Sequence, residues 1–381
     1  MDINKKIVIA THELVYGVPQ ALKDYLLKRK ASHLVFLGLP FFVSRNATFT
    51  LYKKGKVRES KKLHRPLSFG VFDYFLDFFT VIWWIYKSKN RYEYFIGVNA
   101  LNCLSGLVLK KMGRVKKVIF YTMDFVPVRF ENKLLNYVFH KIEITCVKSS
   151  DEVWNVSPRM AEGREKYLDL SRKKYPQRFV PVGIWNKKIK KRPFTKIGKS
   201  RIIFIGHLME KQGVQMVLES FPLIMSEIPK VELLIAGGGD YESELRKKAK
   251  KLNLENRVKF TGWITNREEL DEMISGSAIA VATYKPEKEM LRNFSYYADP
   301  NKLKDYLGGG LPIVLTDISY NAREIEKRKC GVIVKYDKND ISNAVIKLLK
   351  NKKALKKYRA NTLKYAKELD WINIYNNIFT D

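Results

Sequence analysis

A repeated alternation of short apolar runs with helical patterns constrains this chain most. The runs are rich in β-branched residues, and the segments between them repeat their apolar residues every three or four positions. In the first half the predicted strands are residues 6–11, 34–40, 94–99, 117–124 and 151–157, and helical patterns at 20–30 and 103–113 separate some of them. Strands that alternate with helices are typical of parallel βαβ units. The predicted fold class is therefore α/β.

The alternation is interrupted once, by a basic segment. Residues 187–201, KKIKKRPFTKIGKSR, contain eight Lys and Arg with a proline and a glycine, as a solvated connector does. Predicted strands then resume at 201–206, 231–240, 258–263, 278–284, 311–317 and 330–336. We expect two doubly wound, Rossmann-like domains that face one another across a cleft. The predicted parts are an N-terminal domain (1–185), a linker (186–200), a C-terminal domain (201–365) and a tail (366–381) that packs back toward the N-terminal domain.

The charge of the chain is strongly positive, because 71 Lys and Arg outnumber 39 Asp and Glu and give a net charge of +32. Such a field attracts nucleic acids, anionic membrane surfaces or phosphate-bearing small molecules. The basic residues are dispersed and no nucleic-acid-binding motif occurs, so we expect no nucleic acid as partner.

The cysteines and the first residues predict a cytoplasmic protein. Cys103, Cys146 and Cys330 are far apart and lack metal-ligand spacing, which suits a reducing compartment. The apolar stretch near Met1 is too short for the hydrophobic region of a signal peptide.

Three loops of the second half follow predicted strands and contain glycine or basic residues. They hold His207 and Lys211, then the triplet Gly237, Gly238 and Gly239, and then Gly262 beside Trp263. Ligands of parallel sheets bind at the carboxyl ends of the strands, where helix N-termini supply N–H groups. Glycine at such a turn is as often a requirement of turn geometry alone.

A fourth segment, DPNKLKDYLGGGLPIVLTD, is the most informative. Asp299 and Pro300 fit an N-cap and the first position of a helix, and Lys302 and Asp305 lie on one face of that helix. Together these two side chains suit a nucleotide diphosphate and its ribose. The alternative is a surface Lys–Asp pair worth about 0.3 kcal/mol.

These four segments, in this order, resemble the C-terminal half of the family 4 retaining glycosyltransferases, group 1 glycosyl transferases of the GT-B fold. The resemblance implies a nucleotide-sugar donor. It implies that Asp305 holds the ribose hydroxyls with Lys302 nearby, and that the backbone at Trp263 and Ile264 meets the base. The loop with His207 and Lys211 would meet the diphosphate.

The chain departs from the family pattern at three positions. Tyr297 stands where the family has the first Glu of its Glu-x7-Glu motif, which contacts the donor sugar. His207 replaces an Arg, and Gln212 replaces the Lys before the helix glycine, with Lys211 one place early.

The first half is similar to the family in layout and should bind the acceptor. Gly17 resembles a reduced form of the family's Gly-rich loop and is a predicted donor-binding residue. Asp124 follows a predicted strand near the place of a His-Asp pair in many relatives, with Met123 in place of the His, and it is either a catalytic group or a turn former. His12 also follows a strand, as a catalytic base or a hydrogen-bonded structural residue.

No metal or organic cofactor is expected. The chain has no Asp-x-Asp motif and no carboxylate and histidine cluster with metal-ligand spacing. Lysines and helix N-termini would then stabilise the leaving diphosphate.

Residues 67–86 contain nine aromatic residues between basic flanks. Three interpretations remain open: a helix in the N-terminal domain or lining the acceptor site, a helix at a membrane surface, and a transmembrane helix. Asp73 and Asp77 argue against the last, because each costs about 2.5 kcal/mol or more in hydrocarbon.

The function predicted from the sequence is a retaining, metal-independent transfer of a sugar from a nucleotide diphosphate to a glycan or lipid-linked glycan. We expect it in the cytoplasm, peripherally at the inner face of an anionic plasma membrane. The alternatives are a nucleotide-sugar epimerase of the same fold and an inactive basic protein that binds membranes or nucleic acid.

Overall fold

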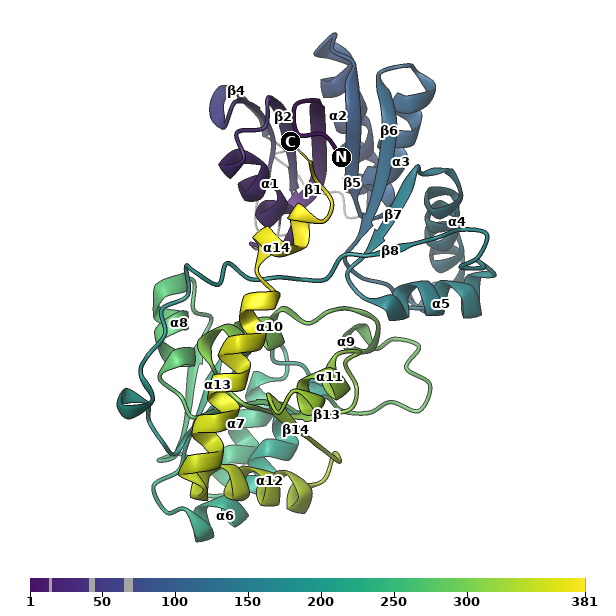
Figure 1. Cartoon of the computed structure of the whole chain (residues 1–381). Helices are drawn as coiled ribbons and strands as arrows, with labels where there is room; N and C mark the ends of the chain where they lie inside the picture. Colours follow the sequence, from purple (N-terminus) through teal and green to yellow (C-terminus); the bar gives the residue numbers. More distant parts are fainter. Residues whose placement is uncertain (14–15, 41–44, 65–70, 381) are drawn as a thin grey trace. The chain divides into compact units, whose positions relative to one another are not determined.

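A computed structural model describes residues 1–13, 16–40, 45–64 and 71–380 (Figure 1). The chain forms two compact units. Unit 1 comprises Met1–Pro181 and Trp371–Asp381, and unit 2 comprises Val182–Asp370. The predicted linker, 186–200, is part of unit 2, where Ile189 and Ile197 are buried.

Unit 1 is built on a sheet in the order β4-β3-β2-β1-β5-β6-β7-β8. The strands are β1 (Lys6–Glu13), β2 (His33–Pro40), β3 (Asn46–Lys53), β4 (Lys56–His64), β5 (Tyr92–Val98), β6 (Val115–Thr122), β7 (Glu152–Asn155) and β8 (Arg178–Phe179). The predicted strands of this half are all present, and their pairing is parallel as predicted.

A hairpin that the sequence did not predict, β3–β4, extends this sheet with antiparallel strands. Its turn has two residues, Lys54 and Gly55, with φ of 49° and 78°. Two positive φ angles in a two-residue turn match the right-handed twist of a hairpin. The hairpin was not predicted because β4, KVRESKKLH, is polar and exposed along most of its length and so lacks the apolar alternation of a buried strand.

The helices of unit 1 are α1 (Val18–Lys28), α2 (Val71–Lys87), α3 (Ala100–Lys111), α4 (Lys133–Ser149), α5 (Pro158–Leu168) and α14 (Trp371–Asn376). Helix α14, from the end of the chain, lies beside α1 (Figure 1), and its Tyr375 donates a hydrogen bond to the carbonyl of Val18. Helix α2 corresponds to the aromatic run, of which residues 67–70 lie outside the described residues. Among the helices described, none combines the length and apolarity needed to cross a bilayer.

A buried polar network joins α4, α5 and the end of β6. The Arg164 guanidinium, fully buried, donates to the Glu143 carboxylate at 3.0 Å and to the Thr122 hydroxyl at 2.8 Å. His140 contacts the same carboxylate at 3.1 Å and the carbonyl of Pro127 at 2.9 Å. Burial alone would raise the pKa of Glu143, but Arg164 and His140 hold it below its ordinary value. The network thus fixes the chain on both sides of Asp124.

Unit 2 contains a wholly parallel sheet in the order β11-β10-β9-β12-β13-β14. Its strands are β9 (Arg201–Ile205), β10 (Glu232–Ala236), β11 (Val258–Gly262), β12 (Ile279–Ala282), β13 (Ile313–Thr316) and β14 (Gly331–Val334). The helices are α6 (Val214–Glu227), α7 (Glu242–Lys251), α8 (Arg267–Ser275), α9 (Phe294–Tyr297), α10 (Asn301–Gly309), α11 (Ala322–Lys327), α12 (Lys338–Lys350) and α13 (Lys352–Glu368). Short 3₁₀ helices lie at Phe194–Lys196 and Glu210–Gln212.

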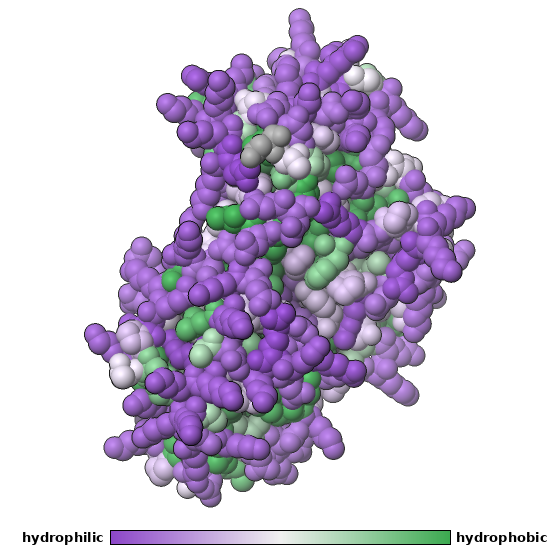
Figure 2. All heavy atoms as spheres, viewed as in Figure 1, coloured by the Kyte–Doolittle hydropathy of each residue, from purple (hydrophilic) through white to green (hydrophobic). Residues whose placement is uncertain are grey.

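Both faces of this sheet are buried, as the continuous apolar strands predict. Ile202 and Phe204 of β9 belong to a core packed with α6 and α12, and the alternate residues Ile203 and Ile205 belong to the core that includes α10. The surface in view in Figure 2 is largely hydrophilic, as expected for so charged a chain.

Helix α10 begins one residue later than predicted, at Asn301, with Pro300 as N-cap. Asp299 is therefore not the cap. Its buried carboxylate instead accepts hydrogen bonds from the Lys304 ammonium at 2.7 Å, the Val182 amide at 2.9 Å and the Tyr320 hydroxyl at 3.0 Å.

A buried tyrosine fixes α10 against the sheet. The Tyr306 hydroxyl accepts a hydrogen bond from the Ile205 amide at 2.8 Å, at the carboxyl end of β9, and lies 3.4 Å from the Val281 carbonyl of β12. The first turns of α10 are thereby held beside the ends of these two strands.

We expect Arg164→Met to destabilise unit 1 by about 3–5 kcal/mol, because it leaves the Glu143 carboxylate buried without its guanidinium partner. Chemical denaturation followed by tryptophan fluorescence measures the loss. The matched change at an exposed arginine of the same unit, Arg172→Met, should leave the midpoint almost unchanged. Equal midpoints for both variants would contradict this role for the network.

Candidate functional site

The strand order of unit 2 reverses beside β9. The chain passes from β9 to β10 and β11 on one side and then returns to β12 on the other. Helices that leave in opposite directions open a crevice at such a point, and ligands of open α/β sheets bind there. A ligand-binding site of unit 2 is therefore expected among the residues that follow β9 and β12.

Lys302 of α10 reaches the carboxyl end of β9. A Cβ atom built on Gly206, which has φ of 122°, would lie 3.3 Å from the Lys302 Nζ. The ammonium donates to Gln212 Oε1 at 2.7 Å and lies over the Phe204 ring, 4.0 Å from its centroid. Among the described residues no carboxylate pairs with it. Burial lowers the pKa of Lys302 to about 7. A bound anion would stabilise the charged form of this side chain.

The glycine triplet brings three loops together. A Cβ atom on Gly237 would lie 1.8 Å from the Gly206 carbonyl oxygen, and one on Gly238 would lie 2.7 Å from Nε1 of Trp263. Backbone this close to its neighbours leaves no room for a side chain. His207, which is exposed, packs edge-on against Trp263 with ring centroids 5.7 Å apart. Trp263 remains 61% exposed, so its ring is available to a flat ligand.

Asp305 lies one turn beyond Lys302, but the two do not pair. The Asp305 carboxylate accepts a hydrogen bond from Arg267 of α8 at 2.7 Å, and the same guanidinium lies 2.8 Å from Asp271. Burial raises the pKa of Asp305, and Arg267 opposes that shift. The surface Lys–Asp pair weighed from the sequence is therefore absent, since each residue has a partner elsewhere.

The other predicted donor residues occupy different surroundings. The Lys211 ammonium lies 4.9 Å from the centroid of the Phe294 ring, and Tyr297 is buried at the end of α9. Ile264 is partly buried against the core that includes α10. Sequence reasoning missed Gln212 and Arg267 as the partners of Lys302 and Asp305.

In unit 1 the strand order reverses between β1 and β5, and His12 stands at the end of β1. Its Nε2 lies 3.0 Å from the carboxylate of Asp77, which is buried on α2. Its Nδ1 lies 3.3 Å from Nδ2 of Asn102, which also donates to the Val98 carbonyl at 2.9 Å. An amide nitrogen only donates, so Nδ1 accepts and Nε2 carries the proton toward Asp77. The imidazole is thus fixed in one tautomer.

Asp124 lies at the same edge, after β6. Its carboxylate pairs with Arg129 at 3.1 Å, and both are partly exposed. The charges of Arg129, Asp77 and Asp124 act on the Tyr74 hydroxyl, whose pKa is raised chiefly by partial burial. The His12 ring lies edge-on to that of Tyr74, with centroids 5.7 Å apart. His12 and Asp124 therefore both interact with this tyrosine. Gly17 is the N-cap of α1, and its amide donates to Gln20 Oε1 at 3.0 Å.

Within the described ranges, three or more His, Cys, Asp or Glu side chains nowhere come together in a way that would hold a metal ion.

Comparison with known families tests the resemblance inferred from the sequence. The model of the family described as "Glycosyl transferases group 1" matches residues 199–351, which include every donor-side residue discussed above. Residues 199–351 are similar to the group 1 glycosyl transferases. The predicted resemblance is confirmed for these residues.

Two curated relatives match about half of the chain. A poly(glycerol-phosphate) alpha-glucosyltransferase of Bacillus subtilis is 24% identical over 47% of this chain and 25% of its own length. A phosphatidyl-myo-inositol mannosyltransferase of Mycobacterium leprae is 25% identical over 49% of this chain and 46% of its own length. The chain thus spans less than half the length of these relatives.

Among solved structures, Anabaena HepE in complex with UDP and glucose is similar in fold. The two chains superpose with a TM-score of 0.71 at 12% identity, covering 98% of each. Together with the two sheets described above, this confirms the predicted GT-B fold class.

We expect nucleotide-sugar affinity to fall as pH rises through 7. Near pH 7 Lys302 loses its proton in the free protein, whereas a bound diphosphate keeps this side chain protonated. The dissociation constant should therefore rise about tenfold per pH unit between pH 7 and 9. Calorimetry with UDP-glucose, ADP-glucose and GDP-mannose measures this slope. Lys302→Met should bind more weakly and without the slope, and the control Lys211→Met should keep it. A constant affinity across this pH range in the parent protein would refute the assignment.

Proposed function

We propose that this chain transfers a sugar from a nucleotide diphosphate sugar to a glycan or lipid-linked glycan, with retention at the anomeric carbon and without a metal ion. The observation that carries the proposal is the arrangement on α10. One short helix presents Lys302, an ammonium with no carboxylate partner among the described residues, and one turn later the carboxylate of Asp305. Both lie at the strand reversal of the part of the chain that matches the group 1 glycosyl transferases.

The donor would lie along the ends of β9, β10 and β11. Lys302 and the amides at the start of α10 would face the diphosphate, and Asp305 would accept hydrogen bonds from the ribose hydroxyls. The base would lie near the exposed Trp263 and the backbone of Ile264, with His207, Lys211 and Gly238 at the same edge. Tyr297 stands at the position of the family's sugar-binding Glu, so the sugar would be held by other groups.

The charge that develops on the leaving diphosphate has to be stabilised for the bond to the sugar to break. In this proposal Lys302 supplies that stabilisation. Its site is only partly solvated, which strengthens its interaction with an anion relative to water. Activity should accordingly persist in EDTA.

The acceptor would bind at the edge of unit 1 that carries His12 and Asp124. Because His12 donates from Nε2 and accepts at Nδ1, we assign it a positioning role, and Asp124 is the group proposed to meet an acceptor hydroxyl. The relatives named above act, by their names, on poly(glycerol phosphate) and on a phosphatidylinositol. These names favour an acceptor that carries phosphate or is anchored in a membrane. The proposed place of the reaction is the cytoplasmic face of that membrane.

Product analysis tests this function directly. The chain is incubated in EDTA with nucleotide sugars chosen by thermal shift, with and without glycan and glycolipid acceptors, and products are followed by mass spectrometry. Sugar transfer only in the presence of acceptor, with an NMR-determined anomer equal to that of the donor, is the expected result. An isomerised donor in the absence of acceptor would instead identify an epimerase, and an inverted product would overturn retention.

We expect Asp305→Ala to weaken nucleotide binding by about tenfold to a hundredfold, because it removes a charged acceptor for the ribose hydroxyls. Asp271→Ala is the matched control, since Asp271 contacts the same Arg267 from α8. Both variants are titrated with the nucleotide diphosphate. A ribose contact predicts weaker binding in Asp305→Ala alone, whereas a general effect on Arg267 would weaken binding in both variants. An unchanged affinity in Asp305→Ala would refute the ribose assignment.

A further inference from the structure

Helix α2 carries an exposed aromatic stripe, which we define as Phe75, Phe79, Trp83 and Tyr86. These side chains are 56%, 62%, 50% and 50% exposed. Their spacing of four, four and three residues places them on one face of the helix. The opposite face is buried in unit 1 through residues such as Val81 and Ile85. The helix is therefore amphipathic, with aromatic side chains on its outer face.

An exposed row of large aromatic side chains is unusual for a soluble protein. Such residues contribute to stability when they are buried, and contiguous exposed apolar surface marks a binding surface. Packing of unit 1 already uses the inner face of α2, so the fold does not account for the outer one. The exposed rings of Phe79, Trp83 and Tyr86 accordingly mark a binding surface.

Cations surround this stripe. The Lys87 ammonium lies 4.8 Å from the centroid of the Trp83 ring, and the Arg114 guanidinium lies 4.6 Å from that of Tyr86. Within the part of the chain that the structure describes, neither cation has a carboxylate at ion-pair distance. Trp and Tyr next to Lys and Arg are the residues that proteins place at the level of lipid headgroups.

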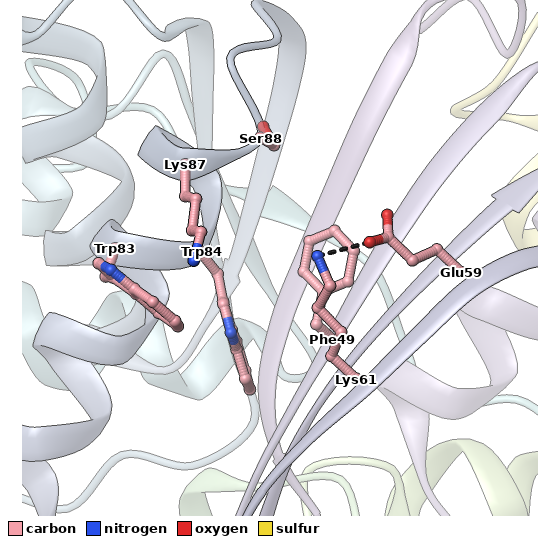
Figure 3. Close-up of a pocket in the computed structure, with 7 residues that line it drawn as sticks. All are labelled: Phe49, Glu59, Lys61, Trp83, Trp84, Lys87 and Ser88. Carbon is pink, nitrogen blue, oxygen red and sulfur yellow. Dashed lines mark ion pairs between the residues drawn. The ribbon is translucent and has the colours of Figure 1, made fainter.

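A groove between α2 and the β3–β4 hairpin continues the surface. It has a volume of about 100 Å³ and is lined by Phe49, Glu59, Lys61, Trp83, Trp84, Lys87 and Ser88 (Figure 3). Figure 3 shows Lys87 and the two tryptophans on one wall and Phe49 and Lys61 on the other, with Lys61 paired to Glu59. A groove of this volume has room for a phosphate group.

The edge strand β4 adds further positive charge beside the groove. It carries Lys56, Arg58, Lys61 and Lys62 against a single acidic residue, Glu59. Lysines on an edge strand also prevent pairing with another sheet. Protection against such pairing does not by itself explain why the basic strand β4 lies beside the aromatic face of α2.

We propose that the outer face of α2, together with the groove and β4, docks on an anionic lipid bilayer. The aromatic stripe would enter the interfacial layer, and Lys87 and Arg114 would meet lipid phosphates, Lys87 from the wall of the groove. A second copy of the chain is a poorer occupant, because two chains with a net charge of +32 repel each other. The inference does not depend on the proposed function, since it concerns surface residues outside the donor and acceptor groups.

Sedimentation with vesicles tests the proposal. The full chain should bind vesicles of equal phosphatidylglycerol and phosphatidylcholine, bind pure phosphatidylcholine far more weakly, and be released by high salt. The double variant Phe79→Ser/Trp83→Ser should lose about tenfold or more in partitioning. The variant Lys87→Glu/Arg114→Glu should lose a similar factor together with most of the salt dependence.

The matched control is Tyr167→Ser on α5, which removes an exposed tyrosine with a lysine, Lys166, 5.0 Å from its ring centroid. It should bind vesicles like the parent. Circular dichroism and nucleotide affinity should be unchanged in every variant. This result would show that folding and the donor site are intact, so the test of membrane binding stays separate from the test of function. Equal vesicle binding by parent and double variant would overturn the proposal, as would an α2-dependent dimer that ignores anionic lipid.

Discussion

The reversal of strand order beside the first strand of each sheet decides where this molecule can place functional groups. At that point the flanking helices diverge and the strand ends are left open, so side chains and backbone groups can converge there on a ligand. In unit 2 the reversal lies between β9 and β12, and Tyr306 spans it by contacting both strands. This contact holds α10, and with it Lys302, at the crevice. In unit 1 the same reversal brings together His12 and Asn102.

The strands and most helices were predictable because each depends on the pattern of residues within its own segment. A β-branched apolar run such as 202–205 reveals a buried strand wherever it occurs, whereas β4 escaped because an exposed edge strand needs no apolar residues. Side-chain partners were not predictable. Lys302 pairs with Gln212, 90 residues away, and Asp305 with Arg267, 38 residues away. Only the folded chain brings such residues together, so the sequence offered the helical neighbours Lys302 and Asp305 as partners for each other.

Helix α2 shows how one segment can satisfy two demands. Asp77 looks out of place in an aromatic run, but it turns inward and meets the imidazole of His12. A buried carboxylate needs such a partner, and an imidazole needs a fixed neighbour to hold one tautomer. The outer face of the same helix is free of this constraint and carries Phe79 and Trp83. The described part of the run is therefore not a simple core helix, because its two faces have different chemistry.

Net charge is a poor guide to where this protein binds anions, because many of its cations are already paired. Lys304 and Lys302 are two residues apart on α10, yet Lys304 pairs with the buried carboxylate of Asp299, whereas Lys302 donates to the neutral amide of Gln212. A neutralised lysine contributes little field, and a partly desolvated lysine without a counterion contributes much. The same contrast separates Lys61, which pairs with Glu59, from Lys87 beside the aromatic stripe. Anions should therefore collect where carboxylates are missing, and the basic residues that matter are identified by their partners, not by their number.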